Sequence, residues 1–267
     1  MAVYSDEKIE FFNRATRDTG FIMAQPHFHN KHELYFLEKG KTKYFVGSEL
    51  YLLEPGDMVF VPKGAFHKTV IDETSERLLF VFDDDFAGAE YAPYVEALKS
   101  NKFIRISSDQ LYKFREIFHK IERENRHHAE DYLEMERLYL RQLLILISRH
   151  RLPENHTNLS ESYLLIQNAA TYISENYHTD LSLTLLAQKY ALSRSHFSKL
   201  FKEVTGVGLN EYINITRISA AEKLLAKKSM TITEVASACG FNDSNYFASV
   251  FKRLKGITPK KYSLMNR

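Results

Sequence analysis

The sequence predicts an α+β protein of two domains, with a β-rich front part, appended helices and an all-helical C-terminal part. Three observations predict this division. Strand-like runs fill residues 33–82, a helical period begins near residue 109, and an internal repeat occupies the last third. The length of 267 residues suits about two domains. We expect a first domain over residues 1–150, a linker over 151–160 and a second domain over 161–267.

The front part has the spacing of a sandwich or barrel of β-strands. Runs such as Leu34–Leu37, Met58–Val61 and Leu78–Phe82 alternate with breaks such as Glu54-Pro-Gly-Asp57. Strands that recur every ~8–12 residues with Gly and Pro between them are typical of these folds. Several runs alternate only weakly between apolar and polar residues, so we expect both sheet faces to be covered, as in a jelly roll. The barrel is expected over about residues 20–85.

Two motifs in this part place histidines and a glutamate at fixed spacings. They are His27-x-His29-x-x-x-Glu33-(x)6-Gly40 and Gly56-(x)5-Pro62-x-Gly64-x-x-His67. His27 and His29 are two residues apart, so on a strand they point to the same side. Imidazole nitrogens together with one carboxylate suit Zn, Ni, Fe or Mn.

Both motifs closely resemble those of the cupin superfamily, although Ile71 stands where the second motif usually ends in Asn. The resemblance implies a cupin-type β-barrel with an interior site. The residues expected to line an effector pocket, and to hold any divalent metal, are His27, His29, Glu33 and His67. The alternative is that they serve as pocket walls or hydrogen-bond anchors without a metal, and no cofactor is required in either case. His32 lies outside the motifs and is expected at the rim or in solvent.

Helices are expected over about residues 109–150. The first carries an apolar stripe from Leu111 to Ile121, and the second runs from about Tyr132 to Arg149. The second helix is apolar on more than one side, so it must bury more than one face. One face would cover the barrel, and the other would meet a second subunit. The residues expected at this dimer interface are Leu138, Leu140, Leu144 and Ile147. The alternative is that both faces pack within one domain.

The last third contains a duplication with an offset of 50 residues. Phe197, Phe201, Lys202, Gly206 and Tyr212 recur as Phe247, Phe251, Lys252, Gly256 and Tyr262. A repeat that keeps its aromatic, basic and glycine positions is a duplicated supersecondary element. Each copy is typical of a helix-turn-helix unit, and we expect the units at about residues 181–204 and 231–255. Ser193, Asp243 and a Thr231–Glu234 capping box are the expected helix starts.

A helix-turn-helix unit places its second helix in the major groove of DNA. The outward residues expected to read bases are Arg194, Ser195, Ser198, Lys199, Ser244, Asn245, Ala248 and Ser249. The residues at helix ends that suit phosphates are Lys202, Lys252, Arg253 and Lys255. A connecting helix over residues 209–227 would fix the separation of the two units, which must be ~34 Å for two reading helices on one DNA face.

The order and spacing over residues 162–267 resemble the AraC/XylS family of bacterial transcription regulators. The motif that carries this is Thr231-Ile-x-Glu-Val-Ala-x-x-x-Gly-Phe241-x-x-x-x-Tyr-Phe247-x-x-x-Phe251-Lys252-x-x-x-Gly256-x-Thr-Pro259-x-x-Tyr262. The family often joins this domain to a cupin-like effector and dimerisation domain. The resemblance implies double-stranded DNA, a small-molecule effector and a second copy as partners, and RNA polymerase if the protein is an activator. By resemblance to members that control carbohydrate use, the effector is expected to be a sugar or a similar polar ligand.

Charge and cysteine content agree with this interpretation. Residues 161–267 carry 14 Lys and Arg against 8 Asp and Glu, whereas the rest of the chain is net acidic. A basic C-terminal third suggests a polyanion as partner of that part. Cys239 is the single cysteine, the first residues resemble no secretion signal, and the aliphatic run 143–147 is far too short to cross a bilayer. A cytoplasmic protein without membrane contact is expected.

Two hypotheses about function follow. The first is a dimeric, sequence-specific, ligand-responsive transcription regulator, an activator rather than an enzyme. The second is a metal-dependent cupin enzyme, such as an isomerase or dioxygenase, with a DNA-binding passenger domain. The second hypothesis gives no reason for the duplicated module, so the sequence favours the first.

Overall fold

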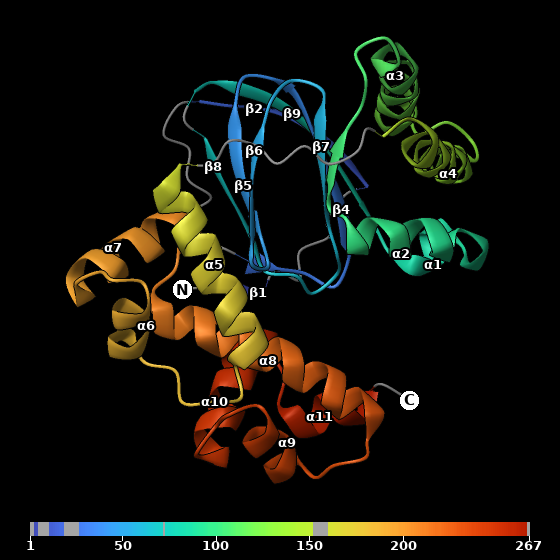
Figure 1. Ribbon diagram of the computed structural model, residues 1–267. Coiled ribbons are helices and arrows are strands. Elements are labelled where there is room, and N and C mark those ends of the chain that lie inside the picture. The colour runs from blue at the N-terminus through green and yellow to red at the C-terminus, as the bar shows by residue number, and fades with distance from the viewer. Residues whose placement is uncertain (1–2, 5–10, 19–26, 72, 152–159, 266–267) are drawn as a thin grey trace.

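The computed structural model describes residues 3–4, 11–18, 27–71, 73–151 and 160–265 (Figure 1). Its strands are β1 (Val3–Tyr4), β2 (Phe12–Arg17), β3 (His27–Phe28), β4 (His32–Lys39), β5 (Thr42–Val46), β6 (Glu49–Leu53), β7 (Asp57–Val61), β8 (His67–Ile71), β9 (Ser75–Phe82) and β10 (Phe103–Arg105). Its helices are α1 (Asp84–Ala87), η1 (Ala89–Tyr91), α2 (Ala92–Ser100), α3 (Leu111–His127), α4 (Tyr132–His150), α5 (Glu161–Asn176), α6 (Leu183–Lys189), α7 (Arg194–Thr205), α8 (Leu209–Lys227), α9 (Ile232–Ala238), α10 (Ser244–Lys255) and α11 (Pro259–Met265).

The strands form two five-stranded sheets that pack against each other. One sheet has the order β1-β3-β8-β5-β6 and the other has the order β10-β7-β4-β9-β2. Tyr44 and Val46 from the first sheet share a core with Tyr35 and Leu37 from the second. The predicted β-rich N-terminal domain is therefore confirmed. The sheets extend beyond the expected range of about 20–85, because β2 begins before it and β10 follows it.

The second sheet is covered on both faces, which explains the weak alternation of its strands. In β4 the side chains alternate between two cores, since successive residues of a strand point to opposite faces. Tyr35 and Leu37 lie between the sheets, whereas Leu34 and Phe36 pack beneath the helices α1 to α4. Figure 1 shows these helices on one side of the sheets and the C-terminal helices on another.

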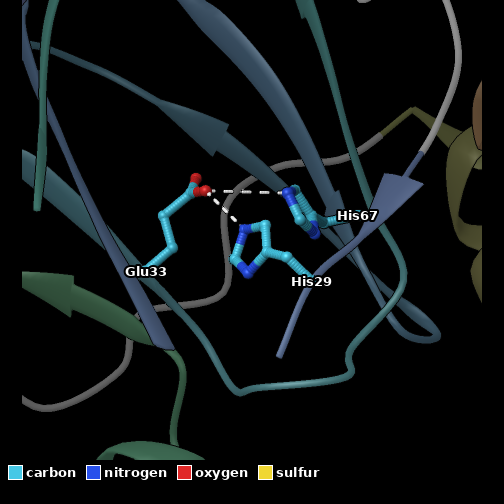
Figure 2. A group of neighbouring side chains, drawn as sticks. All are labelled: His29, Glu33 and His67. Atoms are coloured by element: carbon cyan, nitrogen blue, oxygen red, sulfur yellow. Dashed lines mark hydrogen bonds and ion pairs between the residues drawn. The ribbon is translucent and has the colours of Figure 1, made fainter. Parts of the chain in front are cut away.

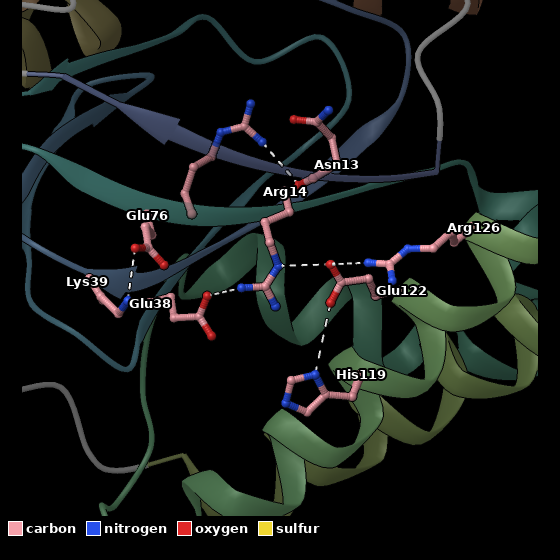
Figure 3. Close-up of polar contacts among 9 residues, drawn as sticks. Asn13, Arg14, Glu38, Lys39, Glu76, His119, Glu122 and Arg126 are labelled. Atoms are coloured by element: carbon pink, nitrogen blue, oxygen red, sulfur yellow. Dashed lines mark hydrogen bonds and ion pairs between the residues drawn. The ribbon is translucent and has the colours of Figure 1, made fainter.

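An ion-pair network joins the second sheet to α3 (Figure 3). The guanidinium of Arg14 in β2 contacts Glu38 in β4 and Glu122 in α3. Glu122 also contacts Arg126 one turn further along the same helix. Arg14 therefore links two strands and the helix that covers them.

The expected dimer contact needs correction in three of its four residues. Leu140, Leu144 and Ile147 are buried in this chain's own core, together with Phe114 and Phe118 of α3 and the second sheet. Side chains that the chain itself covers are not available to a partner. The sequence did not predict α1 and α2, and both contact α4. Leu138 differs, because it is 47% exposed.

The C-terminal helices contain the two predicted helix-turn-helix units, α6–α7 and α9–α10. Their starts are capped as expected. The Ser193 hydroxyl accepts from the backbone N–H of His196, and Thr231 and Glu234 form the reciprocal capping box. Asp243 accepts from two backbone N–H groups at the start of α10. Each cap satisfies amides that would otherwise lack a partner within the helix.

The duplication seen in the sequence is also a duplication of packing. The ring centroids of Phe201 and Tyr212 lie 5.3 Å apart, edge to face, and those of Phe251 and Tyr262 lie 5.4 Å apart in the same manner. Phe201 belongs to the second helix of the first unit, and Phe251 belongs to that of the second. The conserved spacing therefore serves one structural purpose twice, which is to join each second helix to the helix that follows it.

The two turns differ at one backbone position. In the second unit Gly240 follows α9 with φ +81°, and in the first unit Ala191 follows α6 with φ +54°. This left-handed region suits glycine, whereas a side chain there costs about 1–2 kcal/mol. Ala191 is exposed, so its methyl group gains little from packing. The first unit therefore contains backbone strain that the second unit avoids.

Ala191→Gly should stabilise the protein by up to about 1 kcal/mol, because it removes this strain. The matched change Gly240→Ala should destabilise it by about 1–3 kcal/mol. A Cβ at that position would also lie 2.7 Å from the carbonyl oxygen of Tyr177. Urea unfolding followed by circular dichroism measures both effects. A destabilised Ala191→Gly variant would show that the turn is not strained.

Candidate functional site

The second helix of each unit presents a polar face away from the core. Phe197 and Phe201 bury one side of α7, and Phe247 and Phe251 bury the same side of α10. The structure exposes five of the eight expected base-reading residues and leaves the other three partly exposed. The exposed residues are Arg194, Ser195, Lys199, Asn245 and Ser249, and the partly exposed ones are Ser198, Ser244 and Ala248. All eight therefore lie outside the hydrophobic core.

The expected phosphate contacts fall into two groups. Lys202 and Lys252 are exposed near the ends of α7 and α10. The guanidinium of Arg253 forms a two-pronged ion pair with the Glu211 carboxylate, at 2.7 and 3.0 Å. This pair uses two of the five N–H groups of the guanidinium, so Arg253 would approach a phosphate with its charge already partly compensated.

Lys255 is not placed to contact DNA, which corrects the expectation. Its side chain is 8% exposed, and its ammonium lies 2.6 Å from the Glu222 carboxylate of α8. Burial lowers the pKa of Lys255, although Glu222 opposes this. Lys255 therefore joins α10 to α8. The sequence could not show this, because Glu222 is distant along the chain.

Three of the four motif residues meet between the two sheets (Figure 2). His29 follows β3, Glu33 lies in β4 and His67 begins β8, and all three are buried. One ligand atom from each lies within 4.8 Å of the others. The Glu33 carboxylate is 3.2 Å from His29 Nε2 and 3.7 Å from His67 Nε2. We call these three residues the interior triad.

For the fourth motif residue, His27, the structure describes the backbone but not the side chain. Its backbone pairs with that of His67 across β3 and β8. Its expected role in the pocket therefore lies outside the described side chains and stays a prediction. Tyr44, which the motifs do not include, donates its hydroxyl to Glu33. The sequence signal that could have identified Tyr44 is its spacing, since it lies two residues from Val46 in β5 and so points to the same face of the sheet.

Both histidines of the triad are oriented by backbone carbonyls. Nδ1 of His29 lies 2.9 Å from the carbonyl oxygen of Lys31, and Nδ1 of His67 lies 3.0 Å from that of Ala65. A carbonyl oxygen can only accept, so each Nδ1 carries a proton and donates it. The Nε2 atoms then face Glu33. Metal-binding histidines are commonly held in this way, so the triad fits a divalent transition metal.

The electrostatics of the triad favour a positive charge beside Glu33. Burial raises the pKa of Glu33, but His67, His29 and Tyr44 outweigh burial and hold its pKa far below the ordinary value. Burial lowers the pKa of His29, but Glu33 outweighs that effect and raises its pKa. A proton on His29 or a metal cation can supply this charge, and the two compete for the same nitrogen.

His32 is fully buried, which corrects the expectation of a rim position. Its Nδ1 accepts from the backbone N–H of Lys63, and its Nε2 donates to Asp84 at 2.9 Å. Its ring stacks on Phe60. His32 lies one residue before Glu33 in β4 and so points to the opposite face, beneath the start of α1. It belongs to the helix-covered core rather than to the triad.

Comparison with known proteins agrees with both halves of this geometry. A family model described as a helix-turn-helix domain matches residues 186–264, and one described as a cupin domain matches residues 14–82. The HTH-type transcriptional activator RhaR of Escherichia coli strain K12 is 25% identical over 247 residues, covering 90% of this chain and 87% of its own. RhaR of Shigella boydii matches to the same extent. The chain therefore joins a cupin domain to a helix-turn-helix domain and is similar to RhaR over most of its length.

The chain is a DNA-binding, ligand-responsive transcription regulator. Solved structures also match. ToxT from Vibrio cholerae is 14% identical over 95% of this chain and 97% of its own, with a TM-score of 0.39. The C-terminal domain of the response regulator yesN from Fusobacterium nucleatum is 35% identical over 39% of this chain and 99% of its own, with a TM-score of 0.36. Among the described residues, every helix is too short or too polar to span a bilayer.

Proposed function

We propose that the protein is a homodimeric activator that reads DNA with α7 and α10 and responds to a polar ligand held between its sheets. The observation that carries the proposal is the pair of equivalent helices with exposed polar faces. The connecting helix α8 joins the two units and packs against both. One chain would then read two successive major grooves.

In this proposal the reading helices supply specificity and the lysines at their ends supply affinity. Arg194 and Asn245 occupy the first turns of α7 and α10 and are exposed. Arg and Asn form bidentate contacts with guanine and adenine edges, respectively. Lys202 and Lys252 suit phosphates, and neutralising phosphates supplies most of the binding energy.

Lys199→Ala and Asn245→Ala should each weaken binding to a duplex that the wild-type chain selects from random sequences. A lost base contact costs about 1–3 kcal/mol, or roughly 5–150-fold in Kd. Lys202→Ala should instead lower the slope of log Kd against log salt concentration by about 1, because one phosphate contact is lost. Fluorescence anisotropy of labelled duplex measures both. The matched control is Lys227→Ala on α8, and unchanged affinity for both reading-helix variants would refute the assignment.

Activation is proposed from the likeness to RhaR, whose name describes an activator. It implies contact with RNA polymerase and action in the cytoplasm. Transcription in vitro from a promoter that carries the selected duplex distinguishes activation from repression. More transcript on adding the protein supports activation, and less transcript identifies a repressor.

The proposed effector site is the interior triad with the buried polar groups beside it. Tyr44 and Arg77 are buried there with the triad, and both interact electrostatically with Glu33. Buried polar groups that converge on one place suit a hydroxyl-rich ligand such as a sugar. His29, Glu33 and His67 would hold a divalent metal, with His27 as a further ligand.

Wild-type protein freed of metal by chelation should bind Zn²⁺, and Glu33→Gln should weaken this binding at least about tenfold. The amide keeps the shape of the side chain but removes the charge that attracts the metal. Titration calorimetry measures the affinity, and Glu76→Gln, at an exposed ion pair with Lys39, is the matched control. Equal Zn²⁺ affinity in all three proteins would exclude the triad as the metal site. Titrating monosaccharides into the same proteins tests the polar effector.

Dimerisation is proposed through the outer side of α4 around Leu138, which is 47% exposed. Exposed apolar side chains on a helix mark candidate contacts. We expect the wild-type chain to sediment as a dimer and Leu138→Glu to shift it toward monomer, because a buried unpaired charge is costly. Leu164→Glu, at an exposed leucine of α5, is the control. A dimer that survives Leu138→Glu would place the contact elsewhere.

A further inference from the structure

We infer that Tyr212 of α8 and the segment 62–68 form a physical connection between the interior triad and the first DNA-reading helix, α7. The inference rests on the proposed effector site, since it says how a change in that site reaches DNA. The connection consists of short, wholly or partly buried contacts, and each step involves a different pair of groups.

The first step joins the triad to the loop between β7 and β8. The backbone N–H of Gly64 donates to the carbonyl oxygen of His29 at 2.8 Å. The carbonyl oxygen of Ala65 accepts from Nδ1 of His67 at 3.0 Å. Two of the three triad residues therefore hold this loop directly. His29 holds the loop through its backbone and His67 holds it through its ring, so a ligand that turns the His67 imidazole has to move the loop or break the bond to Ala65.

The second step joins the loop to α8 through a single residue, Gly47. The backbone N–H of Gly47 donates to the carbonyl oxygen of Phe66 at 2.8 Å. The carbonyl oxygen of Gly47 accepts from the Tyr212 hydroxyl at 2.7 Å. The rings of Phe45 and Phe66 also meet the Tyr212 ring edge to face, at 6.1 and 6.0 Å. Tyr212 is 3% exposed, so these contacts are shielded from water.

The third step reaches α7 at two points. The Tyr212 ring packs edge to face on Phe201 of α7 at 5.3 Å. Lys68, which follows His67 in β8, lies against Gly206 at the end of α7, where an added Cβ would clash with its side chain. The equivalent Gly256, at the end of α10, has open space around it. The sheets thus cover the end of the first reading helix but leave the equivalent glycine of the second uncovered.

Space beside the connection allows it to shift. Gly64, Ala65, Phe66 and Tyr212 line a cavity of about 540 Å³ between the sheets and α8. Packed interiors resist deformation, but on this side the loop borders an open pocket instead of packed side chains. The loop therefore has room to move toward the pocket. A change at the triad would then alter the position of α7 relative to α10, and with it the fit to two successive grooves.

A double-mutant cycle in the full-length chain tests the connection. Glu33→Gln perturbs the triad, and Tyr212→Phe removes only the hydroxyl that binds Gly47. The Kd for the selected duplex should change at least threefold on Glu33→Gln in the wild-type background and less than twofold in the Tyr212→Phe background. Tyr262→Phe, the repeat counterpart, is the matched control and should leave the threefold change intact. Changes that simply multiply in the double variant would overturn the inference.

Hydrogen exchange followed by mass spectrometry gives a readout that does not need DNA. Glu33→Gln should speed amide exchange several-fold in residues 62–67 and in residues 209–216, but not in the equivalent residues 259–265. Faster exchange confined to 62–67 would overturn the connection. If the wild-type chain binds no DNA, the proposed function fails while the exchange result still decides the inference. His29→Gln replaces Glu33→Gln if circular dichroism shows that the latter does not fold.

Discussion

A carboxylate buried between two sheets has to be compensated, and this requirement organises the N-terminal domain. Glu33 is 4% exposed, and an ionised group in such a place is costly unless charges and hydrogen bonds surround it. His29, His67 and Tyr44 provide them from three other parts of the chain. Because the backbone carbonyl of Ala65 orients the His67 imidazole, the need for compensation also involves the loop that follows β7. The same groups that stabilise the carboxylate therefore prepare a site for a cation.

The C-terminal domain shows how a duplicated unit becomes asymmetric without changing its fold. Capped starts and aromatic contacts recur in both units at nearly the same distances. Ala191 takes the place of Gly240, and Lys68 lies against Gly206, whereas no described residue lies close to Gly256. The copies thus keep the interactions that define the unit and differ in how they meet the sheets. Strand β8 reaches the end of α7 through Lys68, whereas α10 contacts the edge strand β1.

Much of the fold and part of the site were predictable because they depend on short spacings along the chain. Residues two or four apart on strands, and caps at helix starts, have positions that local geometry decides, so the triad and both units were found. Contacts between distant segments were not predictable. Lys255 resembled a phosphate ligand until Glu222 of α8 was seen beside it. Leu140 and Ile147 in α4 were predicted at a dimer interface because the sequence did not predict α1 and α2. Both of these helices contact α4 within the same chain.

His32 shows the same limit within a single strand. Successive side chains of a strand alternate, so His32 points to the face opposite Glu33. Whether that face is buried or exposed to solvent depends on the helices that cover it. The sequence motif gave no information about the helices, so a buried histidine bound to Asp84 was assigned to solvent. In a sheet covered on both faces, the alternation of side chains along a strand shows which residues share a face. It does not show whether that face contacts solvent, a helix or another sheet.

The two-pronged pair between Arg253 and Glu211 has a consequence for the energetics of DNA binding. The pair occupies two of the five N–H groups of the guanidinium, so a phosphodiester in the proposed complex would either use the remaining groups or displace Glu211. In both cases the Glu211 carboxylate would stay near the DNA strand, where its charge opposes that of the backbone. Arg253 would therefore contribute less to the proposed DNA binding than an arginine without an acidic partner.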